Sequence, residues 1–189
     1  MTARYPALPR IWLVTDARTN ELLDRAIARL LRGSGVIFRH YHLPPRERAA
    51  RLAQVRRLCR RFGHRLEVAG DGYGPPAPHR RLATAHSLRE IGRANRWNND
   101  AVLISPIFAT RSHPAAAVLG RVRLLLLARR AQMPVIALGG MTARRFRGLA
   151  IHGWAAIDGL AARPAHKPPT TIRAGNPARA LLGARTTHP

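Results

Sequence analysis

Residues 100–108, DAVLISPIF, form the most distinct strand candidate in the chain, and the residues that follow them, ATRSHP, carry two hydroxyls, an arginine and a histidine. A short apolar run between polar flanks is typical of a parallel strand that is buried on both faces. The stretch therefore predicts a buried strand that ends in a set of anion-binding groups. The fold of the rest of the chain can be worked out from this strand in both directions.

Strand-like and helix-like segments alternate on both sides of this run. The predicted strands are residues 10–16, 35–41, 64–71, 80–87, 100–108, 133–140 and 154–161. The predicted helices are residues 21–33, 43–63, 88–97, 119–132 and 142–153. This alternation predicts an α/β fold, and seven such strands favour a TIM-type (β/α) barrel. An open doubly wound sheet is the alternative, but the turn after the first strand, TDARTNE, lacks the glycine-rich fingerprint of a dinucleotide site.

One connection is too short for a regular barrel. Residues 72–79, GYGPPAPH, separate two predicted strands, whereas a parallel crossover takes about a dozen residues or more. We therefore expect the barrel to be shortened or irregular near residues 72–79. Residues 1–162 are expected to form a single barrel domain, and residues 163–189, which are basic and rich in proline, a disordered tail.

Composition limits the classes of partner and compartment. The chain has 189 residues, 33 of them Lys or Arg, with a formal net charge of +24 and Lys167 as its only lysine. These cations are scattered over every helical segment, which is typical of solvated helix faces, so we do not expect a nucleic-acid partner. The single cysteine, Cys59, excludes an internal disulfide, and no apolar run reaches the roughly 20 residues of a membrane span. We expect a soluble, cytoplasmic protein without a membrane partner.

Polar residues gather at the predicted C-terminal ends of the strands, where TIM barrels carry their chemistry. The set comprises Asp16, Arg39, Asp71, Thr84, His86, the turn at 105–113, Gly139, Gly140 and Asp158. Two glycines after an apolar strand let a backbone come close to a ligand, and the N–H groups that open the next helix can hold a phosphate. The set predicts an anion site beside carboxylates.

Three segments, SPIFATRSHP, MPVIALGGMT and GWAAIDGLA, resemble the C-terminal half of the thiamine phosphate synthase and thiazole tautomerase (TenI) family. The resemblance is specific over residues 83–160, where TAHSLRE is also similar to the family's Ser-Thr-His-Ser-x-x-Glu segment. It implies a TIM barrel and, in the synthase branch, a transferase of thiamine biosynthesis. That transferase joins hydroxymethylpyrimidine pyrophosphate to a thiazole phosphate, releases pyrophosphate and uses Mg²⁺.

The resemblance also implies roles for individual residues. It marks Arg39, Thr110 and Ser112 as catalytic and Asp71 as a metal ligand. Residues implied to bind substrate or phosphate are Thr84, His113, Gly139, Gly140 and Asp158. The implied partners are small-molecule phosphates and pyrophosphates, and a homo-oligomer is left open.

The chain departs from the family pattern at several of these positions. Of the family's Gln-x-Arg-x-Lys motif only Arg39 is kept, with Ile37 and Tyr41 at the glutamine and lysine positions, and Asp158 replaces a serine. Asp71 can stand for only one of the family's two metal ligands. Two other hypotheses therefore stay open: a divergent TenI-like or inactive member that binds a thiazole phosphate, and a polyanion or nucleic-acid binder.

Overall fold

A computed structural model describes residues 7–70, 82–97, 99–111 and 117–161 of the chain. Seven strands form one sheet in it: β1 (Ile11–Val14), β2 (Gly35–Phe38), β3 (Arg65–Val68), β4 (Leu82–Ala85), β5 (Ala101–Ile104), β6 (Val135–Ala137) and β7 (Gly153–Ala156). The helices are η1 (Ala17–Leu22, a 3-10 helix), α1 (Leu23–Arg29), α2 (Pro45–Phe62), α3 (Leu88–Arg96), α4 (Gly120–Ala128), α5 (Ala143–Phe146) and α6 (Asp158–Ala161).

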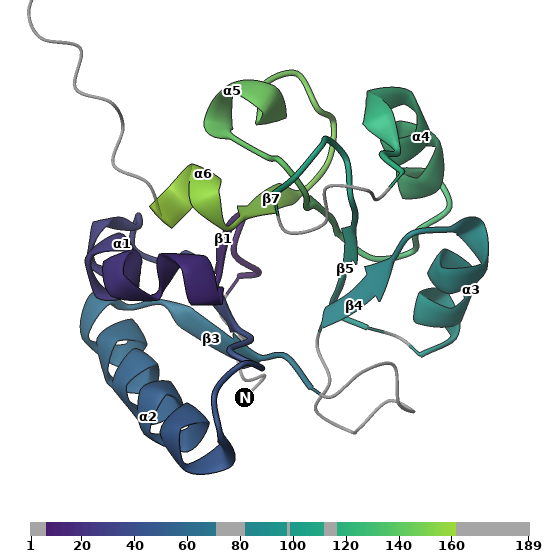
Figure 1. The fold of residues 1–189 in the computed structure, drawn as a ribbon. Coiled ribbons are helices and arrows are strands. Elements are labelled where there is room, and N and C mark those ends of the chain that lie inside the picture. The colour runs from purple at the N-terminus through teal and green to yellow at the C-terminus, as the bar shows by residue number, and fades with distance from the viewer. Residues whose placement is uncertain (1–6, 71–81, 98, 112–116, 162–189) are drawn as a thin grey trace, which may run out of the picture.

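The strands are all parallel and follow the order β3-β2-β1-β7-β6-β5-β4. The sheet curls into a half-barrel, and the helices lie around its outside (Figure 1). Within the described residues β3 and β4 are the two edge strands, while β1 and β7, from opposite ends of the described chain, pair at its centre. The TIM-type prediction is confirmed, and the parallel arrangement brings all seven C-terminal strand ends to one side.

Alternating strand residues face two different apolar cores. One core is made of strand residues alone and fills the inside of the curled sheet: Trp12, Val14, Ile37, Ala101, Leu103, Ile136 and Ala155. The residues between them pack outward against helices, as Leu13, Val36 and Phe38 do against α1 and α2. The period of two along each strand explains why the predicted strands are apolar throughout: both faces are covered.

Trp12 is the largest side chain in the inner core, and it needs a glycine opposite. It is paired in register with Gly35, where an added Cβ would lie 2.1 Å from Trp12 Cε3. Its indole Nε1 donates to the Pro9 carbonyl at 2.8 Å, and the Arg65 guanidinium lies 5.9 Å from the ring centroid. Arg65 also contacts Glu67 at 2.7 Å and Asp100 at 3.4 Å, so one guanidinium links edge strand β3 to the residue before β5.

Several element predictions are confirmed and two are wrong. Ser87 caps α3 by accepting from the Glu90 N–H at 3.3 Å, and Cys59 is a buried core thiol. The predicted strand over 154–161 is wrong in its second half, because residues 158–161 turn into α6 after β7 ends at Ala156. The predicted helix over 142–153 is much too long: α5 ends at Phe146, and Gly148 has a left-handed φ of 73° that a continuing helix does not allow.

Two predictions fall outside the described residues. Residues 72–79 and residues 163–189 are not described, so the irregular connection and the boundary between barrel and tail stay predictions. No helix in the described part of the chain is long and apolar enough to cross a membrane.

Candidate functional site

The C-terminal strand ends carry most of the predicted site residues that the structure describes. Thr84 lies on β4 with its side chain exposed, opposite Leu103, and Thr110 lies half-buried in the turn after β5. Asp71, Ser112 and His113 lie outside the described residues. The remaining residues fall into two groups, one at the ends of β1, β2 and β7 and one at the ends of β5 and β6, which together we call the strand-end site.

In the first group, one arginine holds two carboxylates. Arg18, in η1, donates from Nε to Asp16 Oδ1 at 2.9 Å and from Nη1 to Asp158 Oδ2 at 3.4 Å. Asp16 also accepts from the Arg18 backbone N–H at 3.1 Å, which makes it the cap of η1. The sequence did not single out Arg18. A chain so rich in arginine was nevertheless expected to offer some arginine partner to Asp158. The ion pair partly offsets the charge of Asp158, which stands where the family has a serine.

The pKa of the Asp16 carboxyl is lowered from its ordinary value. Partial burial raises it, but the two hydrogen bonds from Arg18 and the positive fields of Arg18 and Arg39 outweigh that effect. Asp16 is therefore ionised at neutral pH and balanced by two cations. This charge balance removes much of the repulsion that two strand-end carboxylates would otherwise exert on a phosphate.

The described donors do not fit a magnesium ion. Mg²⁺ prefers several oxygen ligands in near-octahedral geometry, whereas the part of the chain described here contains no group of three His, Cys, Asp or Glu side chains placed to hold a metal. Asp16 and Asp158, the carboxylates at the ends of β1 and β7, share the Arg18 guanidinium instead. The expected ligand, Asp71, lies outside the described residues, so its role stays a prediction.

Arg39 stands at the end of β2 with its guanidinium uncommitted. No acceptor in the described residues hydrogen-bonds the guanidinium, which lies 5.6 Å from the centroid of the Tyr41 ring. The backbone of Arg39 is fixed on both sides, because its N–H donates to Thr15 Oγ1 at 2.9 Å and its carbonyl accepts from Arg48 Nε at 3.1 Å. A guanidinium carries five donors in a planar fork, so this residue can take a phosphate in bidentate fashion.

A buried polar chain lies beside Arg39. Thr15 Oγ1 is 2.7 Å from His40 Nδ1, and His40 Nε2 is 2.9 Å from Asn20 Oδ1. Thr15 and His40 are 0% and 1% exposed, and burial together with the charges of His42 and Arg51 lowers the pKa of His40 to about 4. Nothing in the sequence pattern indicated Thr15 or Asn20, since the three residues are 5 to 25 positions apart and come from different elements.

In the second group, Gly139 and Gly140 pack against the turn after β5. Their φ values are +97° and +59°, and an added Cβ would lie 2.8 Å from Pro106 Cα at Gly139 and 2.5 Å from the Ala109 carbonyl oxygen at Gly140. Only glycine fits both the left-handed backbone and the available space. The glycine pair is thus required to bring the β6 and β5 turns together, whichever ligand the turns bind.

Arg145 adds a cation to this group that the sequence did not point to. Its Nη1 donates to the Gly140 carbonyl, and its guanidinium lies 4.7 Å over the centroid of the Phe108 ring. Among the described residues it has no carboxylate partner. Two guanidinium groups without a carboxylate partner among the described residues therefore stand at the strand-end site, Arg39 by β2 and Arg145 by β6. Between them lie the two carboxylates that share Arg18, Asp16 by β1 and Asp158 by β7.

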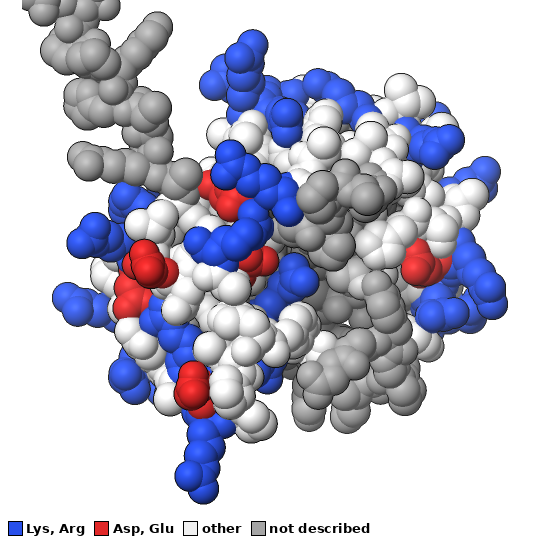
Figure 2. Space-filling model, viewed as in Figure 1, with Lys and Arg blue, Asp and Glu red and all other residues white. Residues whose placement is uncertain are grey.

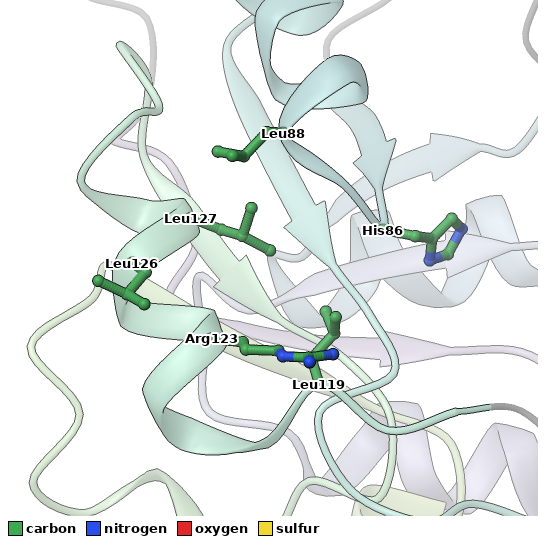
Figure 3. Close-up of a pocket in the computed structure, with 6 residues that line it drawn as sticks. All are labelled: His86, Leu88, Leu119, Arg123, Leu126 and Leu127. Carbon is green, nitrogen blue, oxygen red and sulfur yellow. The ribbon is translucent and has the colours of Figure 1, made fainter.

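A separate hollow of about 270 Å³ lies on the outside of the sheet between α3 and α4 (Figure 3). Its lining is mostly leucine: His86, Leu88, Leu119, Arg123, Leu126 and Leu127. His86, one of the predicted strand-end residues, donates from Nδ1 toward the Ser105 carbonyl at 2.5 Å. None of the residues assigned above to catalysis or phosphate binding lines this hollow.

The fold and the strand ends define a TIM-type α/β protein that presents arginines and a glycine turn at one end of its sheet. A family model described as thiamine monophosphate synthase matches residues 82–162. A thiamine-phosphate synthase from Chloroflexus aurantiacus is 31% identical over 160 residues, which cover 70% of this chain and 74% of the relative. The chain belongs to the thiamine phosphate synthase family.

Two further comparisons agree with this membership. A relative from Aquifex aeolicus, whose name also contains thiamine-phosphate synthase, is 29% identical over 181 residues, covering 81% of this chain and 96% of the relative. The solved structure of a thiamine phosphate pyrophosphorylase from Pyrococcus furiosus matches with a TM-score of 0.69 at 21% identity, over 82% of this chain and 88% of that one. The structural match supports the fold, and the sequence matches support the family.

Proposed function

We propose that this protein is a thiamine phosphate synthase-like transferase, which joins hydroxymethylpyrimidine pyrophosphate to a thiazole phosphate. In this reaction the bond between the pyrimidine methylene carbon and the pyrophosphate oxygen breaks, and pyrophosphate leaves with the electron pair. The thiazole nitrogen supplies the electron pair of the new carbon–nitrogen bond. No oxidant or reductant is needed, so the protein has to hold two phosphorylated substrates and stabilise the leaving pyrophosphate.

The observation that carries the proposal is the uncommitted guanidinium of Arg39, on a backbone that is fixed on both sides. We assign the pyrophosphate to Arg39, because charge that develops on the leaving group is best stabilised by a donor that does not have to reorganise. We assign the thiazole phosphate to Gly139, Gly140 and Arg145, since backbone donors and a cation meet there. Thr84, on β4, and Thr110, in the turn after β5, stay proposed substrate contacts on the β6 side of the sheet.

Mg²⁺ is part of this proposal through family membership and Asp71 alone. A divalent cation supplies charge that neutralises a leaving pyrophosphate. The steps above are assigned to this chain's own side chains, because the described donors do not fit a metal. A cytoplasmic location and a homo-oligomer likewise stay predictions.

The test of the proposal is a turnover assay with two matched arginine variants. Purified protein is given both substrates, with Mg²⁺ or with EDTA, and thiamine phosphate is measured after oxidation to its fluorescent product. We expect wild type to turn over and Arg39→Ala to lower kcat/KM by about a hundredfold or more, the usual loss for one preorganised donor. Arg129→Ala, which removes an exposed arginine at the end of α4 and away from the strand ends, should leave kcat/KM unchanged.

A second candidate function is binding of a thiazole phosphate without transfer. This candidate is favoured by Ile37 and Tyr41, which stand where the family has a glutamine and a lysine. Tyr41 supplies no positive charge at the lysine position, and its hydroxyl donates to the Gly70 carbonyl at 3.2 Å. In the same assay this candidate predicts a folded protein that binds thiazole phosphate and makes no thiamine phosphate. Turnover by wild type excludes it.

A further inference from the structure

The backbone of Arg39 lies just beyond the hydrogen-bond ladder of the sheet. The last ladder bonds on its two sides run from Thr15 N to the Ile37 carbonyl and from Ala69 N to the Phe38 carbonyl, both at 2.9 Å. At Arg39, one residue later, the backbone hydrogen bonds are made to side chains and no longer to neighbouring strands. The Arg39 N–H donates to the Thr15 hydroxyl, and the Arg39 carbonyl accepts from the Arg48 guanidinium. The position of Arg39 therefore depends on how firmly these side chains are held.

The Thr15 hydroxyl has its direction fixed by the groups behind it. Asn20 Oδ1 accepts from Arg51 Nε at 2.9 Å, and a carbonyl oxygen can only accept, so His40 Nε2 must carry the proton that it shares with Asn20. In a neutral ring Nδ1 is then an acceptor, and the Thr15 hydroxyl donates to it. The lone pairs of Thr15 Oγ1 are then free to accept from the Arg39 N–H. All three hydrogen bonds therefore run in one direction, from the Arg39 N–H to Thr15, from Thr15 to His40 and from His40 to Asn20.

The surroundings of His40 keep its ring neutral and hold its backbone in a left-handed conformation. Two cations of α2, Arg48 and Arg51, face it, and the ring of His42, from the preceding loop, lies 5.2 Å away between centroids. Among the described residues, Asp16 at the end of β1 opposes them with its negative charge. The ring stacks on Phe38 at 4.8 Å, and the residue adopts φ +37°, a left-handed conformation that few side chains favour outside a constrained site.

We propose that Thr15, His40 and Asn20 form a positioning network that fixes the Arg39 backbone and thereby sets where its guanidinium meets a pyrophosphate. The inference rests on the proposed function, in which Arg39 is the pyrophosphate ligand. The network residues touch no substrate in this proposal and act only through Arg39. Their removal should therefore affect pyrophosphate and leave the thiazole phosphate side of the site unchanged.

The primary test compares Thr15→Val, which removes only the hydroxyl, with Thr15→Ser, which keeps it. Calorimetric titration with inorganic pyrophosphate should give about a tenfold weaker Kd for Thr15→Val, a size expected for a small misplacement of a binding group, and a Kd near wild type for Thr15→Ser. KM for the thiazole phosphate should stay unchanged in both variants. Thr19→Val is the matched control, because it also removes a buried hydroxyl, bonded at 3.3 Å to the Asp16 carbonyl, without touching Arg39.

A double-mutant cycle separates positioning from a general loss of structure. In an Arg39→Ala background, Thr15→Val should weaken pyrophosphate binding no further, because the group it positions is gone. Weakening by the same factor in both backgrounds overturns the proposal, and so does an unchanged Kd in Thr15→Val. If Arg39→Ala loses pyrophosphate and Thr15→Val does not, the network fails and the proposed function stands. If wild type neither binds pyrophosphate nor turns over, both fail together.

A measurement on the wild-type protein does not depend on variant folding. Nitrogen NMR of the His40 ring should show a neutral imidazole with its proton on Nε2 at pH 7 and at pH 5.5. A proton on Nδ1, or a charged ring at pH 5.5, contradicts the hydrogen-bond direction on which the network depends.

Discussion

At the scale of single residues, His40 links the stability of the fold to pH. A histidine ordinarily has a pKa of 6.5, and in the folded protein burial lowers that of His40 to about 4. Between these two values the unfolded chain binds a proton that the folded protein does not. The free energy of unfolding therefore falls as pH falls from 6.5 toward 4, and above 6.5 this contribution does not change with pH.

We expect urea unfolding to reveal this slope. One proton corresponds to about 1.4 kcal/mol per pH unit at the steepest part, and His64, whose pKa burial also lowers, adds to it in the same direction. His40→Asn, which tolerates the left-handed backbone and cannot titrate, should flatten the slope between pH 6.5 and 4.5. An equally steep slope in this variant would mean that His40 takes up its proton in the folded state.

At this scale, the sequence predicted residues that can be recognised from their type and their position at a strand end. It missed residues whose role depends on which other side chains they contact in the fold. Arg39 and the glycine pair could be predicted from strand-end position and resemblance. Arg18, Arg145 and Asn20 could not, because their roles come from contacts between residues as far as 140 positions apart, and no local pattern encodes them. In a chain with 33 basic residues, an individual arginine also carries little information.

At the scale of elements, alternation along the strands predicted the sheet, and short apolar runs were the source of error. Residues 154–161 were predicted as one strand because they are apolar apart from Asp158 and Gly159, so no polar segment separates strand β7 from helix α6. A run of this length does not distinguish strand from helix, and the outcome depends on packing against Met141 and the β6 turn, where Gly159 makes close contact. Such close contacts also mean that adding a single methyl group to a strand can change the free energy of unfolding.

A pair of glycine variants tests that sensitivity. Gly35→Ala places a methyl group 2.1 Å from the buried Trp12 ring and should lower the free energy of unfolding by about 1–3 kcal/mol, the range for overpacked cores. Gly92→Ala, in α3 with nothing within 4 Å of the new methyl, should raise it by about 0.5–1 kcal/mol through helix propensity. Chemical denaturation measures both, and equal shifts of the two variants would contradict the packing argument.

At the scale of the whole molecule, the surface is dominated by unpaired positive charge. Figure 2 shows arginine side chains spread over the visible face, with few carboxylates between them. On α2, Arg56, Arg57, Arg60 and Arg61 have no carboxylate within ion-pair distance in the described part of the chain. Like charges at this density repel one another, which costs the compact state stability.

Salt should therefore stabilise the protein. The Debye length falls from about 30 Å at 0.01 M salt to about 10 Å at 0.1 M, so repulsion between neighbouring helix faces is screened, while each exposed ion pair gives up at most about 1 kcal/mol. We expect the melting temperature to rise between 10 and 300 mM sodium chloride, and choline chloride to give the same rise. A falling melting temperature would show that the few ion pairs outweigh the repulsion.

The pairing of β1 with β7 has a consequence for how the chain is made. Strands β1 to β3 and their helices are contiguous in sequence, yet β1 receives its second neighbour only when β7 has been synthesised, about 85 residues after β3. At the usual 5–20 residues per second, roughly 4–17 s pass on the ribosome after β3 is made, during which β1, an apolar strand, has one free edge. A free apolar edge can pair with another chain, so the nascent half-sheet depends on chaperones or on fast completion of the chain.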